Sequence, residues 1–513
     1  MASYGSNAKS VNPDISSGLP PGWVRARLDE CCEIIQGQSP PGDTYNIQGT
    51  GLPFFQGAAE FGETYPKAIK WCSAPKKVAE KDDILLSIRA PVGPTNLASE
   101  KCCIGRGLTA IRPLANIPPV YILYALRFLV QSLAAAGTGS TFDAIGSATI
   151  REFQVPLAPL GEQIRIISEI ERQFTRLDAG VKALERTKAH LKRYRASVLK
   201  AACEGRLVPQ DPKDEPAEKL LIRLKKERQE MWEAKELVRI KPKSTPPEND
   251  NWKPTYKEPS LGETKNLPNL PLGWSWVRSE ALFIKVTSGS RWWAKYYSLE
   301  GAKFIRIGNL NHESITLDLQ NIQHVEPPTN AEAIRTRLIP RDILISITAD
   351  VGMVAIVPDD IGIAYNNQHI ALARPLKSLN VYYLAWYLAS RYGGWRQFLE
   401  LQRGATKQGL GLDDILAIHI PIPPLNEQTR IVEEINKRLS IYDKMIETIT
   451  NLLQRSFSLR QSIFKIAFSG RLVPQDNRDE PATTLLKCIQ EERCLDPGQL
   501  KNVYHRESKG VHL

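Results

Sequence analysis

The chain has 513 residues, of which 42% are hydrophobic and 24% are charged, which is enough for about two to four domains with real cores. Its net charge of +11 favours an acidic partner such as nucleic acid. The eight cysteines show no Cys-x-x-Cys spacing, which argues against a zinc site or a disulfide framework. The sequence contains no run of about 18 apolar residues, so no membrane span is predicted.

The N-terminal part of the chain divides into a polar tail and a globular domain. Residues 1–18 lack the apolar stretch of a signal peptide, so we expect a disordered tail on a cytoplasmic protein with reduced thiols. Residues 19–155 mix short apolar strands with turns. Candidate strands are 84–88 and 109–112, and residues 120–133 form a candidate helix. The pattern predicts a mixed α+β domain of about 140 residues.

Residues 156–238 are predicted to be helical. Over 162–203 the apolar residues recur in alternating steps of three and four, which is a coiled-coil seam of about five heptads. Such a helix is about 60 Å long at ~1.5 Å per residue. A shorter helix is expected over 217–235. The seam positions are 167, 170, 174, 177, 181, 184, 188, 191, 195, 198 and 202.

The remaining chain repeats this organisation after a linker. Residues 239–269 are rich in Pro, Lys, Asn and Glu, as is typical of linkers. Residues 270–420 form a second α+β domain, with candidate strands 343–348 and 369–373 and a candidate helix 381–398. Residues 421–513 are helical again, with a short helix over 483–492. The second seam has the same spacing, at 432, 435, 439, 442, 446, 449, 453, 456, 460, 463 and 467.

An internal repeat links the two halves. The heptapeptide GRLVPQD occurs at 205–211 and at 470–476, and each copy is followed by DEPA. At this offset of 265, residues 156–217 are identical to their counterparts at 25 of 62 positions. We call the two α+β domains, residues 19–155 and 270–420, the front domains. Upstream the offset falls to 259 and then to 251, because the second front domain carries extra residues between its motifs. Two similar helices packed antiparallel would relate the halves by a pseudo-twofold axis.

The two seams share one polar position, occupied by Arg195 and Arg460. A polar residue in a seam lowers stability but can fix the register of the helices. The alternative is that each arginine lies at a splayed end of the coil. The sequence leaves both interpretations open.

Catalytic motifs are absent from the sequence. It contains no G-x-x-x-x-G-K-[ST] loop, no G-x-G-x-x-G after a strand, no [ND]-P-P-aromatic tetrad and no H-E-x-x-H. The acidic pairs at 82–83 and 413–414 are interpreted as turn or helix-cap residues. We therefore expect a non-catalytic chain that binds no metal or cofactor of its own.

The repeated motifs resemble a known family. Each half begins with L-P-x-G-W (19–23 and 270–274), enters its helix through P-L-x-E-Q-x-R-I (159–166 and 424–431) and leaves it through G-R-L-V-P-Q-D. Over about 490 residues this is similar to the specificity subunit of type I restriction–modification systems. The segment 404–410 resembles the usual end of a target-recognition domain, whereas 139–145 departs from that pattern.

The resemblance implies a function and partners. Each front domain would be a target-recognition domain that reads one half of a bipartite double-stranded DNA site, and an antiparallel coiled coil would hold the halves apart. Two methylation subunits would carry S-adenosylmethionine, and restriction subunits would use ATP and Mg²⁺. Two alternatives are a stand-alone DNA-binding regulator and a chain that works with a nuclease–methylase fusion.

Reading base edges requires donors and acceptors on loops. The segments that differ between the copies, 37–61 and 288–311, are therefore the best candidates, although any one residue could be an ordinary solvated side chain. The basic stretch 182–206 has eight Lys and Arg against two Glu, which fits either phosphate contacts or a solvated helix face. The aromatic residues Trp292, Trp293, Tyr296 and Tyr297 indicate a core cluster or an exposed anchor. The candidate DNA-binding residues are Arg89, Arg106, Lys192, Arg193, Arg306, Asn309, Gln368, His369, Arg403 and Lys407.

Overall fold

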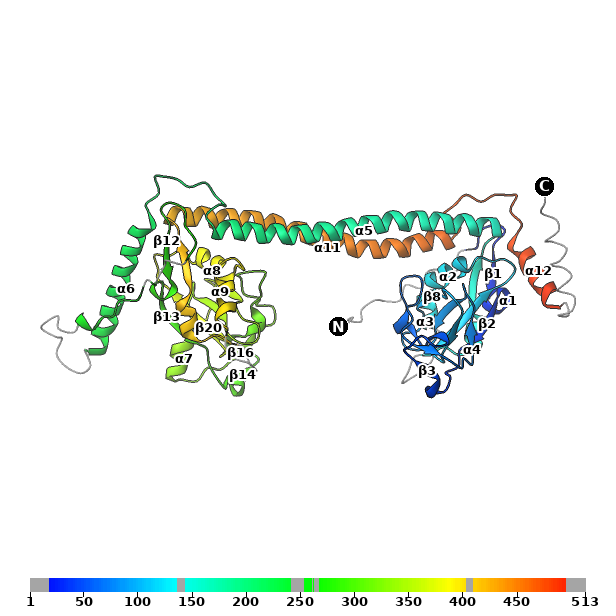
Figure 1. The fold of residues 1–513 in the computed structure, drawn as a ribbon, viewed down its shortest axis with the longest axis horizontal. Helices are drawn as coiled ribbons and strands as arrows, with labels where there is room; N and C mark the ends of the chain where they lie inside the picture. The colour runs from blue at the N-terminus through cyan, green and yellow to red at the C-terminus, as the bar shows by residue number, and fades with distance from the viewer. Residues whose placement is uncertain are drawn as a thin grey trace. The chain divides into compact units, whose positions relative to one another are not determined.

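The computed structural model of the chain describes residues 18–135, 144–240, 253–260, 262, 267–402 and 409–494. The chain forms two compact units (Figure 1). Unit 1 comprises the residues up to Glu185 together with those from Thr450 onward, and unit 2 comprises Arg186–Ile449. Each unit therefore contains one front domain and part of both long helices.

In unit 1 the central sheet of the front domain has four antiparallel strands in the order β2-β10-β7-β8. A five-stranded sheet, β3-β5-β4-β9-β6, and a two-stranded sheet, β1-β11, complete the domain. The elements are β1 (Val24–Arg27), α1 (Leu28–Cys31), β2 (Cys32–Gln36), β3 (Tyr45–Asn46), β4 (Leu52–Phe55), β5 (Trp71–Cys72), β6 (Val78–Ala79), β7 (Ile84–Ser87), β8 (Thr95–Leu97), β9 (Cys102–Ile104), β10 (Leu108–Pro113), α2 (Pro119–Phe128), α3 (Val130–Ala135), α4 (Ser147–Glu152) and β11 (Gln154–Leu157).

The front domain of unit 2 has the same plan. Its central sheet is β13-β20-β17-β18, beside a four-stranded sheet β14-β16-β15-β19 and the pair β12-β21. Its elements are β12 (Ser275–Arg278), β13 (Phe283–Ser288), β14 (Tyr297–Ser298), β15 (Ala302–Ile305), β16 (Gln323–Val325), α7 (Ala331–Thr336), β17 (Ile343–Ser346), β18 (Val354–Ile356), β19 (Ala364–Asn366), β20 (Ile370–Pro375), α8 (Val381–Ala389), α9 (Gly394–Leu401), α10 (Leu412–Ala417) and β21 (His419–Ile422). The mixed α+β class predicted for both domains is confirmed.

The strands that the sequence predicts lie in the cores. All four residues of β7 and all four of β17 are buried, because each central strand is covered on both faces. In each front domain a buried tyrosine joins one helix, α2 in unit 1 and α8 in unit 2, to the last strand of the domain. The Tyr121 hydroxyl donates to the Pro156 carbonyl at 3.0 Å, and the Tyr383 hydroxyl donates to the Pro421 carbonyl at 2.7 Å.

Two helix predictions were wrong in their continuity. Residues 120–133 form α2 and α3, because Leu129 leaves helical geometry (φ −91°, ψ 12°) while its side chain stays buried. Residues 381–398 form α8 and α9, which are separated by a turn at Ser390–Gly393. Consecutive glycines at 393 and 394 approach the end of α8 so closely that a Cβ at either position would collide with it.

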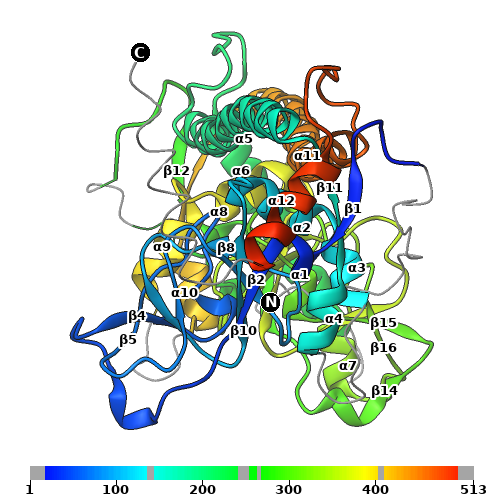
Figure 2. The ribbon, with the colours of Figure 1, turned by 90° about the vertical axis from the view of Figure 1, so that its right-hand side faces the viewer.

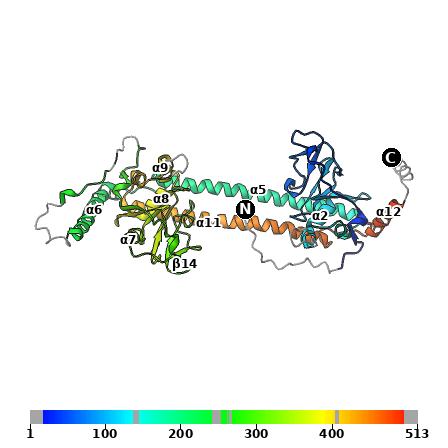
Figure 3. The same cartoon turned by 90° about the horizontal axis from the view of Figure 1, so that it is seen from below.

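The long helices α5 (Leu160–Cys203) and α11 (Leu425–Phe468) form the predicted coil, and every predicted seam position is buried or half-buried. In unit 1 the start of α5 packs against the end of α11, where the Phe174 and Phe464 ring centroids lie 5.2 Å apart. In unit 2 the end of α5 shares a core with the start of α11, including Val198 and Ile435. Within each unit the two helices therefore run antiparallel (Figures 1 and 3).

The repeated motifs hold each helix start in its unit. In unit 1 the Trp23 indole donates to the Glu162 carboxylate at 2.9 Å, and in unit 2 Trp274 does the same to Glu427 at 3.1 Å. Gln163 donates to the carbonyl of Ala158 at 2.8 Å, so the side chain satisfies a backbone group at the helix start. The L-P-x-G-W and P-L-x-E-Q motifs thus bind each other.

The arginine of each helix-start motif pairs with the aspartate that follows the other helix. Arg165 binds Asp479 in unit 1, and Arg430 binds Asp214 in unit 2, both at 2.6 Å. The two copies are therefore exchanged: each unit contains one copy's front domain and the other copy's helix end. The sequence repeat alone does not reveal this exchange.

A glycine ends each long helix. Gly205 and Gly470 adopt left-handed backbone (φ +66° and +67°), which favours glycine and stops the helix. A Cβ there would collide with the ring of Pro271 or Pro20, which belong to the L-P-x-G-W motif of the same unit. The first residues of G-R-L-V-P-Q-D thus turn the chain toward that motif.

The short helices cover the front domains. In unit 1, α12 (Ala482–Cys494) packs on α1 (Figure 2), where Arg493 donates to the carbonyl of Asp29 at 2.7 Å. In unit 2, α6 (Ala217–Ile240) extends five residues beyond its predicted end, and Arg228 donates to the carbonyl of Phe283 at 2.7 Å. Part of the predicted linker packs on α6, since the ring centroids of Tyr256 and Trp232 lie 5.3 Å apart. The predicted tail, apart from Gly18, lies outside the described residues.

Candidate nucleic-acid interface

Four loops meet at one edge of the unit 1 domain, after β2, β4, β7 and β9. Backbone hydrogen bonds tie them together: Gln38 N–H to the Ile104 carbonyl (3.1 Å), Gly105 N–H to the Phe55 carbonyl (2.8 Å) and Ile88 N–H to the Gly107 carbonyl (3.0 Å). Such bonds fix the backbone from which side chains project, as a base-reading surface requires. We call this set of loops the loop face.

Unit 2 has the same loop face with the same bonds. Ser290 N–H donates to the Asn366 carbonyl at 2.8 Å, Asn367 N–H to the Ile305 carbonyl at 3.0 Å, and Ile347 N–H to the His369 carbonyl at 3.0 Å. A strand-like bridge closes each face, between Arg89 and Ala144 in unit 1 and between Thr348 and Gly409 in unit 2. The two backbone frames are therefore equivalent.

In unit 1 the loop face carries four exposed polar side chains, Gln38, Gln56, Arg89 and Arg106. The backbones approach one another closely here, since a Cβ on Gly107 would overlap the Gln56 carbonyl oxygen. Two amides and two guanidiniums offer both donors and acceptors, which are the groups that discriminate bases in the major groove.

In unit 2 the equivalent positions hold Ser290, Arg306, Thr348 and Gln368. Ser290 is buried and shares a hydrogen bond of 2.7 Å with Thr336. Thr348 Oγ1 lies 2.7 Å from His369 Nδ1, and the Gln368 amide lies 3.3 Å from His369 Nε2. The same frame therefore presents different donors and acceptors in the two units.

The structure brings several of the predicted DNA-binding residues together. Arg89 and Arg106 share the loop face of unit 1, and Arg306, Gln368 and His369 share that of unit 2. Gln38 and Gln56 lie within the predicted segment 37–61, but sequence reasoning did not name them individually, and it did not identify Thr348. Aligning each loop separately, at offsets between 250 and 262, would have paired them with their counterparts.

Three other candidates stand apart. Asn309 is 5% exposed, accepts from the Arg306 N–H at 2.8 Å and donates to the Asp318 carbonyl at 2.8 Å. Its amide holds the loop together, which argues against a role in reading bases. Arg403 and Lys407 lie outside the described residues.

Lys192 and Arg193 are both exposed on α5. Arg195 on the same helix reaches the front domain of unit 2. At 3.6 residues per turn, Lys192 lies about 60° from Arg195 around the helix axis and Arg193 about 160° from it. Lys192 is therefore on the side of α5 nearer the domain, whereas Arg193 points away.

The aromatic cluster is divided between core and surface. Trp293 is 2% exposed and donates to Glu332 at 3.0 Å, so it belongs to the core. Trp292 is 86% exposed and adopts a left-handed backbone (φ 60°), a conformation that is uncommon for a residue other than glycine. It follows Ser290 of the loop face by two residues, so the anchor interpretation applies to this tryptophan and not to Trp293.

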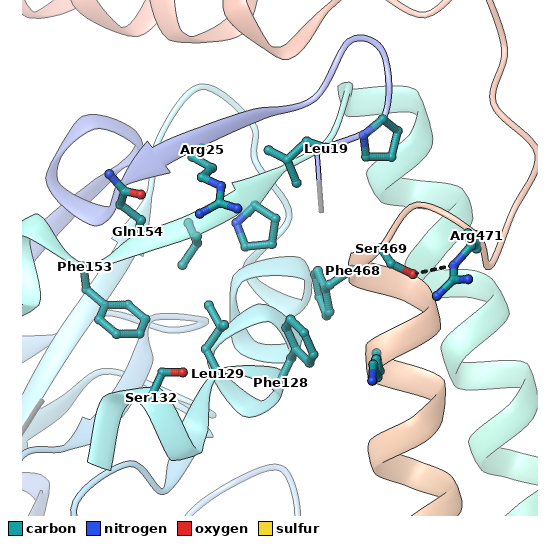
Figure 4. Close-up of a pocket in the computed structure, with 15 residues that line it drawn as sticks. Leu19, Arg25, Phe128, Leu129, Ser132, Phe153, Gln154, Phe468, Ser469 and Arg471 are labelled. Carbon is teal, nitrogen blue, oxygen red and sulfur yellow. Dashed lines mark hydrogen bonds between the residues drawn. The ribbon is translucent and has the colours of Figure 1, made fainter. Parts of the chain in front are cut away.

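A cavity of about 280 Å³ in unit 1 lies between the front domain and the end of α11 (Figure 4). Its walls are largely apolar, and its lining includes Phe128, Phe468 and the cations Arg25, Lys465 and Arg471. No residue of the loop face lines it. The cavity is therefore separate from the candidate nucleic-acid interface.

Several thiols in the described part of the chain have raised pKa values. Burial raises the pKa of the Cys102, Cys103 and Cys203 thiols to about 12, so these thiols are protonated and poorly nucleophilic at neutral pH. Among the described residues, no three His, Cys, Asp or Glu side chains gather in a group that could bind a metal ion. None of the helices in these described ranges is long and apolar enough to cross a bilayer.

Comparison with known proteins places the chain in a family. Residues 20–189 and 295–455 match the family model described as "Type I restriction modification DNA specificity domain". Together the two segments cover more than half of the chain, and each extends from a front domain into a long helix. The match therefore includes both repeats.

Individual relatives agree with this assignment. The chain is 33% identical over 202 residues to the putative type I restriction enzyme MjaX specificity subunit of Methanocaldococcus jannaschii, an alignment that covers 39% of this chain and 47% of the relative. It is 22% identical over 520 residues to the type I restriction enzyme EcoBI specificity subunit of Escherichia coli, covering 97% and 98%. The chain thus spans about half of the first relative and nearly all of the second.

Solved structures share the fold. The HsdS subunit from Thermoanaerobacter tengcongensis is similar with a TM-score of 0.52 and 19% identity, over 88% of this chain and 98% of that one. A chain from a type I R-M system, solved in work on complex assembly and conformational transition, has a TM-score of 0.56 and 20% identity. That similarity covers 88% of this chain and 99% of that one. These findings do not support the alternative of a stand-alone regulator. The chain belongs to the type I restriction–modification DNA specificity family.

Proposed function

We propose that this chain reads a bipartite double-stranded DNA target, one half with each front domain, and thereby directs methylation and restriction subunits to that target. We refer to the front domains as recognition domains from here on. The observation that carries the proposal is the pair of loop faces. Their backbones are held by equivalent hydrogen bonds, yet equivalent positions carry different polar groups, such as Arg106 and Gln368. A common frame with different donors and acceptors suits two different half-sites.

Partner subunits would bind the outer faces of the coil. Two helices cover only one side of each other, and large apolar side chains remain exposed on them, including Ile441, Leu452, Phe457 and Leu459. In unit 1 a groove of about 590 Å³ runs between α5 and α11, lined by Leu177, Val181 and Leu184 among others. Exposed apolar surface of this kind marks interaction sites. We assign it to helices of two methylation subunits, which restriction subunits then join.

The chemistry would reside on those partners. S-adenosylmethionine would bind the methylation subunits, and ATP with Mg²⁺ the restriction subunits, so the isolated chain would neither methylate nor cleave DNA. Its place in the cell would be the cytoplasm, on the chromosome. Methylation by the purified chain with S-adenosylmethionine alone would contradict this division of labour.

Two substitutions test the assignment of half-sites. Methylome sequencing of the host first gives the target, and binding is then measured with the chain assembled on its methylation subunits. Arg106→Ala should relax base preference at one position of one half-site by about tenfold, the size of one bidentate base contact. Gln368→Ala should relax the other half-site. Arg172→Ala is the matched control, because Arg172 pairs with Glu169 on its own helix.

The outcomes separate base reading from simple attraction. A loss confined to one half-site supports the proposal. An equal loss of binding affinity for all DNA sequences would indicate a phosphate contact. Altered preference in both halves from one substitution would contradict the proposal that each domain reads one half.

A further inference from the structure

Arg195 and Arg460 occupy seam positions in the coil, and both also make contacts outside the seam. The seam neighbours of Arg195 remain buried, since Leu191 is 9% and Val198 is 2% exposed, so the coil is not splayed there. Each arginine instead reaches a glutamate on the recognition domain of its own unit. The burial beside Arg195 argues against a splayed end there, whereas the ion pair between Arg460 and Asp178 on α5 is compatible with the register interpretation.

In unit 2 the Arg195 guanidinium donates to the Glu313 backbone carbonyl at 2.7 Å, and its Nε lies 3.6 Å from the Glu313 carboxylate. Only 15% of the Arg195 side chain is exposed. The adjacent residue His312 is held by the domain, with Nε2 2.8 Å from Asp350 and its ring stacked on Trp395 at 4.1 Å. Consecutive residues of one loop therefore join the domain to the coil.

This connection continues to the loop face of unit 2. The Ser346 hydroxyl donates to the Asp350 carbonyl at 2.6 Å, which closes the short loop that carries Thr348. Arg195, Glu313, His312 and Asp350 thus form a continuous path of contacts from the coil to the loop face.

Unit 1 has the equivalent contact. Arg460 pairs with Asp178 on α5, packs over the Phe174 ring at 4.9 Å and lies 3.7 Å from the Glu63 carboxylate. The Glu63 carbonyl accepts a hydrogen bond of 2.7 Å from Arg127 of the recognition domain. Glu63 is therefore also held by the domain on one side and contacted by the coil on the other.

The two contacts are related by the internal repeat. Glu63 and Glu313 are 250 residues apart, the same offset that relates Gln56 to Arg306 on the loop faces, and the arginines are 265 apart. Because the helix ends are exchanged, each arginine contacts the recognition domain of the other copy. Such agreement at two separate sites argues against a chance surface contact.

We infer that Arg195 and Arg460 are positioning residues that clamp each recognition domain at a fixed angle on the coil, and so restrict the DNA spacer that the two half-sites can have. This inference rests on the proposed function, because only a bipartite reader has a spacer. A domain free to tilt on its helices would accept half-sites at more than one separation. The preference for bases within each half-site would stay the same.

The two clamps differ in strength. Arg195 is largely buried and bonds to a backbone carbonyl, so its loss should change a local equilibrium by about tenfold. Arg460 faces an exposed glutamate at 3.7 Å, and such a pair contributes less, about threefold. Because the Arg195 bond is to the backbone, Glu313→Ala should preserve most of the clamp whereas Arg195→Ala removes it.

Hydrogen exchange on the full chain without DNA tests the clamp itself. Arg195→Ala should accelerate exchange in residues 309–316 about tenfold and leave 58–67 unchanged, while Arg460→Ala should accelerate only 58–67. Arg195→Lys, which retains a charged donor, should restore part of the protection. Arg172→Ala should change neither segment. Unchanged exchange in both arginine variants would overturn the clamp, whatever the DNA behaviour.

Spacer selectivity tests its consequence. The assembled complex is given targets whose spacer is native or one base pair longer or shorter. The wild type should prefer the native spacer, and Arg195→Ala should reduce that preference about tenfold while base preference in each half stays constant. Loosened segments with unaltered spacer preference would overturn the inference. A wild type that binds no bipartite target would overturn the proposed function, while the exchange result would still decide whether the clamp exists.

Discussion

Replacing Asp214 with asparagine tests the tie that joins the two copies within unit 2. The Asp214 carboxylate is buried and accepts hydrogen bonds from Arg430 at 2.6 Å and from Asn426 at 3.2 Å. Asparagine keeps the size of the side chain and one acceptor oxygen but removes the charge. A hydrogen bond to a charged group contributes about 1.5–3 kcal/mol. Water reaches the partly exposed Arg430, so we expect a cost near the lower end, about 1.5 kcal/mol.

This cost corresponds to roughly a tenfold change in a local opening equilibrium. Hydrogen exchange at neutral pH should therefore become about tenfold faster in residues 205–217 and 425–435, with their unit 1 counterparts unaffected. The matched variant Asp479→Asn should accelerate exchange in the unit 1 counterparts and leave residues 205–217 and 425–435 unchanged, because Asp479 makes the equivalent ion pair in unit 1. Equal loss of protection in both units, or a change below about twofold, would refute the role of the tie.

The same tie has a pH dependence. Hydrogen bonding from Arg430 lowers the pKa of Asp214 below its usual value. The stabilisation is therefore fully present above the unfolded pKa of about 3.9 and is lost as the pH falls through the lower folded pKa. The difference in unfolding temperature between wild type and Asp214→Asn should be constant above about pH 5 and shrink below about pH 4. A difference that grows on acidification would contradict the assigned sign.

Three further predictions concern the repeated elements. Gly205→Ala and Gly470→Ala should each destabilise their unit by at least about 1–2 kcal/mol in chemical denaturation, because both positions are left-handed and face a proline ring; unchanged stability would contradict this. Burial raises the pKa of Glu427. The wild type should therefore lose stability relative to Glu427→Gln as the pH rises from about 4 to 7. A difference in unfolding temperature between the two proteins that stays constant over this range would contradict this prediction. Inserting one heptad after Leu184 and another after Ile449 should lengthen the preferred spacer by up to about three base pairs, since each adds about 10.5 Å to its helix; binding assays that still show the original spacer would exclude the coil as the ruler.

The sequence predicted the helical part of this fold well because the repeat and the seam are local patterns. Steps of three and four residues define one helix face, and each seam position proved buried or half-buried. The pattern could not show that Arg195 also makes contacts outside the seam, because its contact with Glu313 depends on how the domain packs on the coil. It could not show the pairing of Asp214 with Arg430 either, because that contact lies between the two copies.

The candidate interface was predicted less completely. Arg89 and Arg106 are long, charged loop residues, so their type alone suggested an exposed role. Asn309 has an equally polar side chain, but it bonds within its own loop, and only three-dimensional structure distinguishes the two cases. Gln56 lies within the predicted segment 37–61 but was not named individually, because the offset to its counterpart Arg306 changes within the domain.

Exchange of one recognition domain tests the central claim most directly. Residues 19–155 would be replaced by the corresponding domain of a family member with a different target, and the methylome of a host carrying the assembled system would be sequenced. Modified sites should retain the half-site read by unit 2 and acquire a new half-site in place of the other. Loss or alteration of both half-sites in a hybrid that folds and still assembles with its methylation subunits would show that the two domains form one composite reading surface.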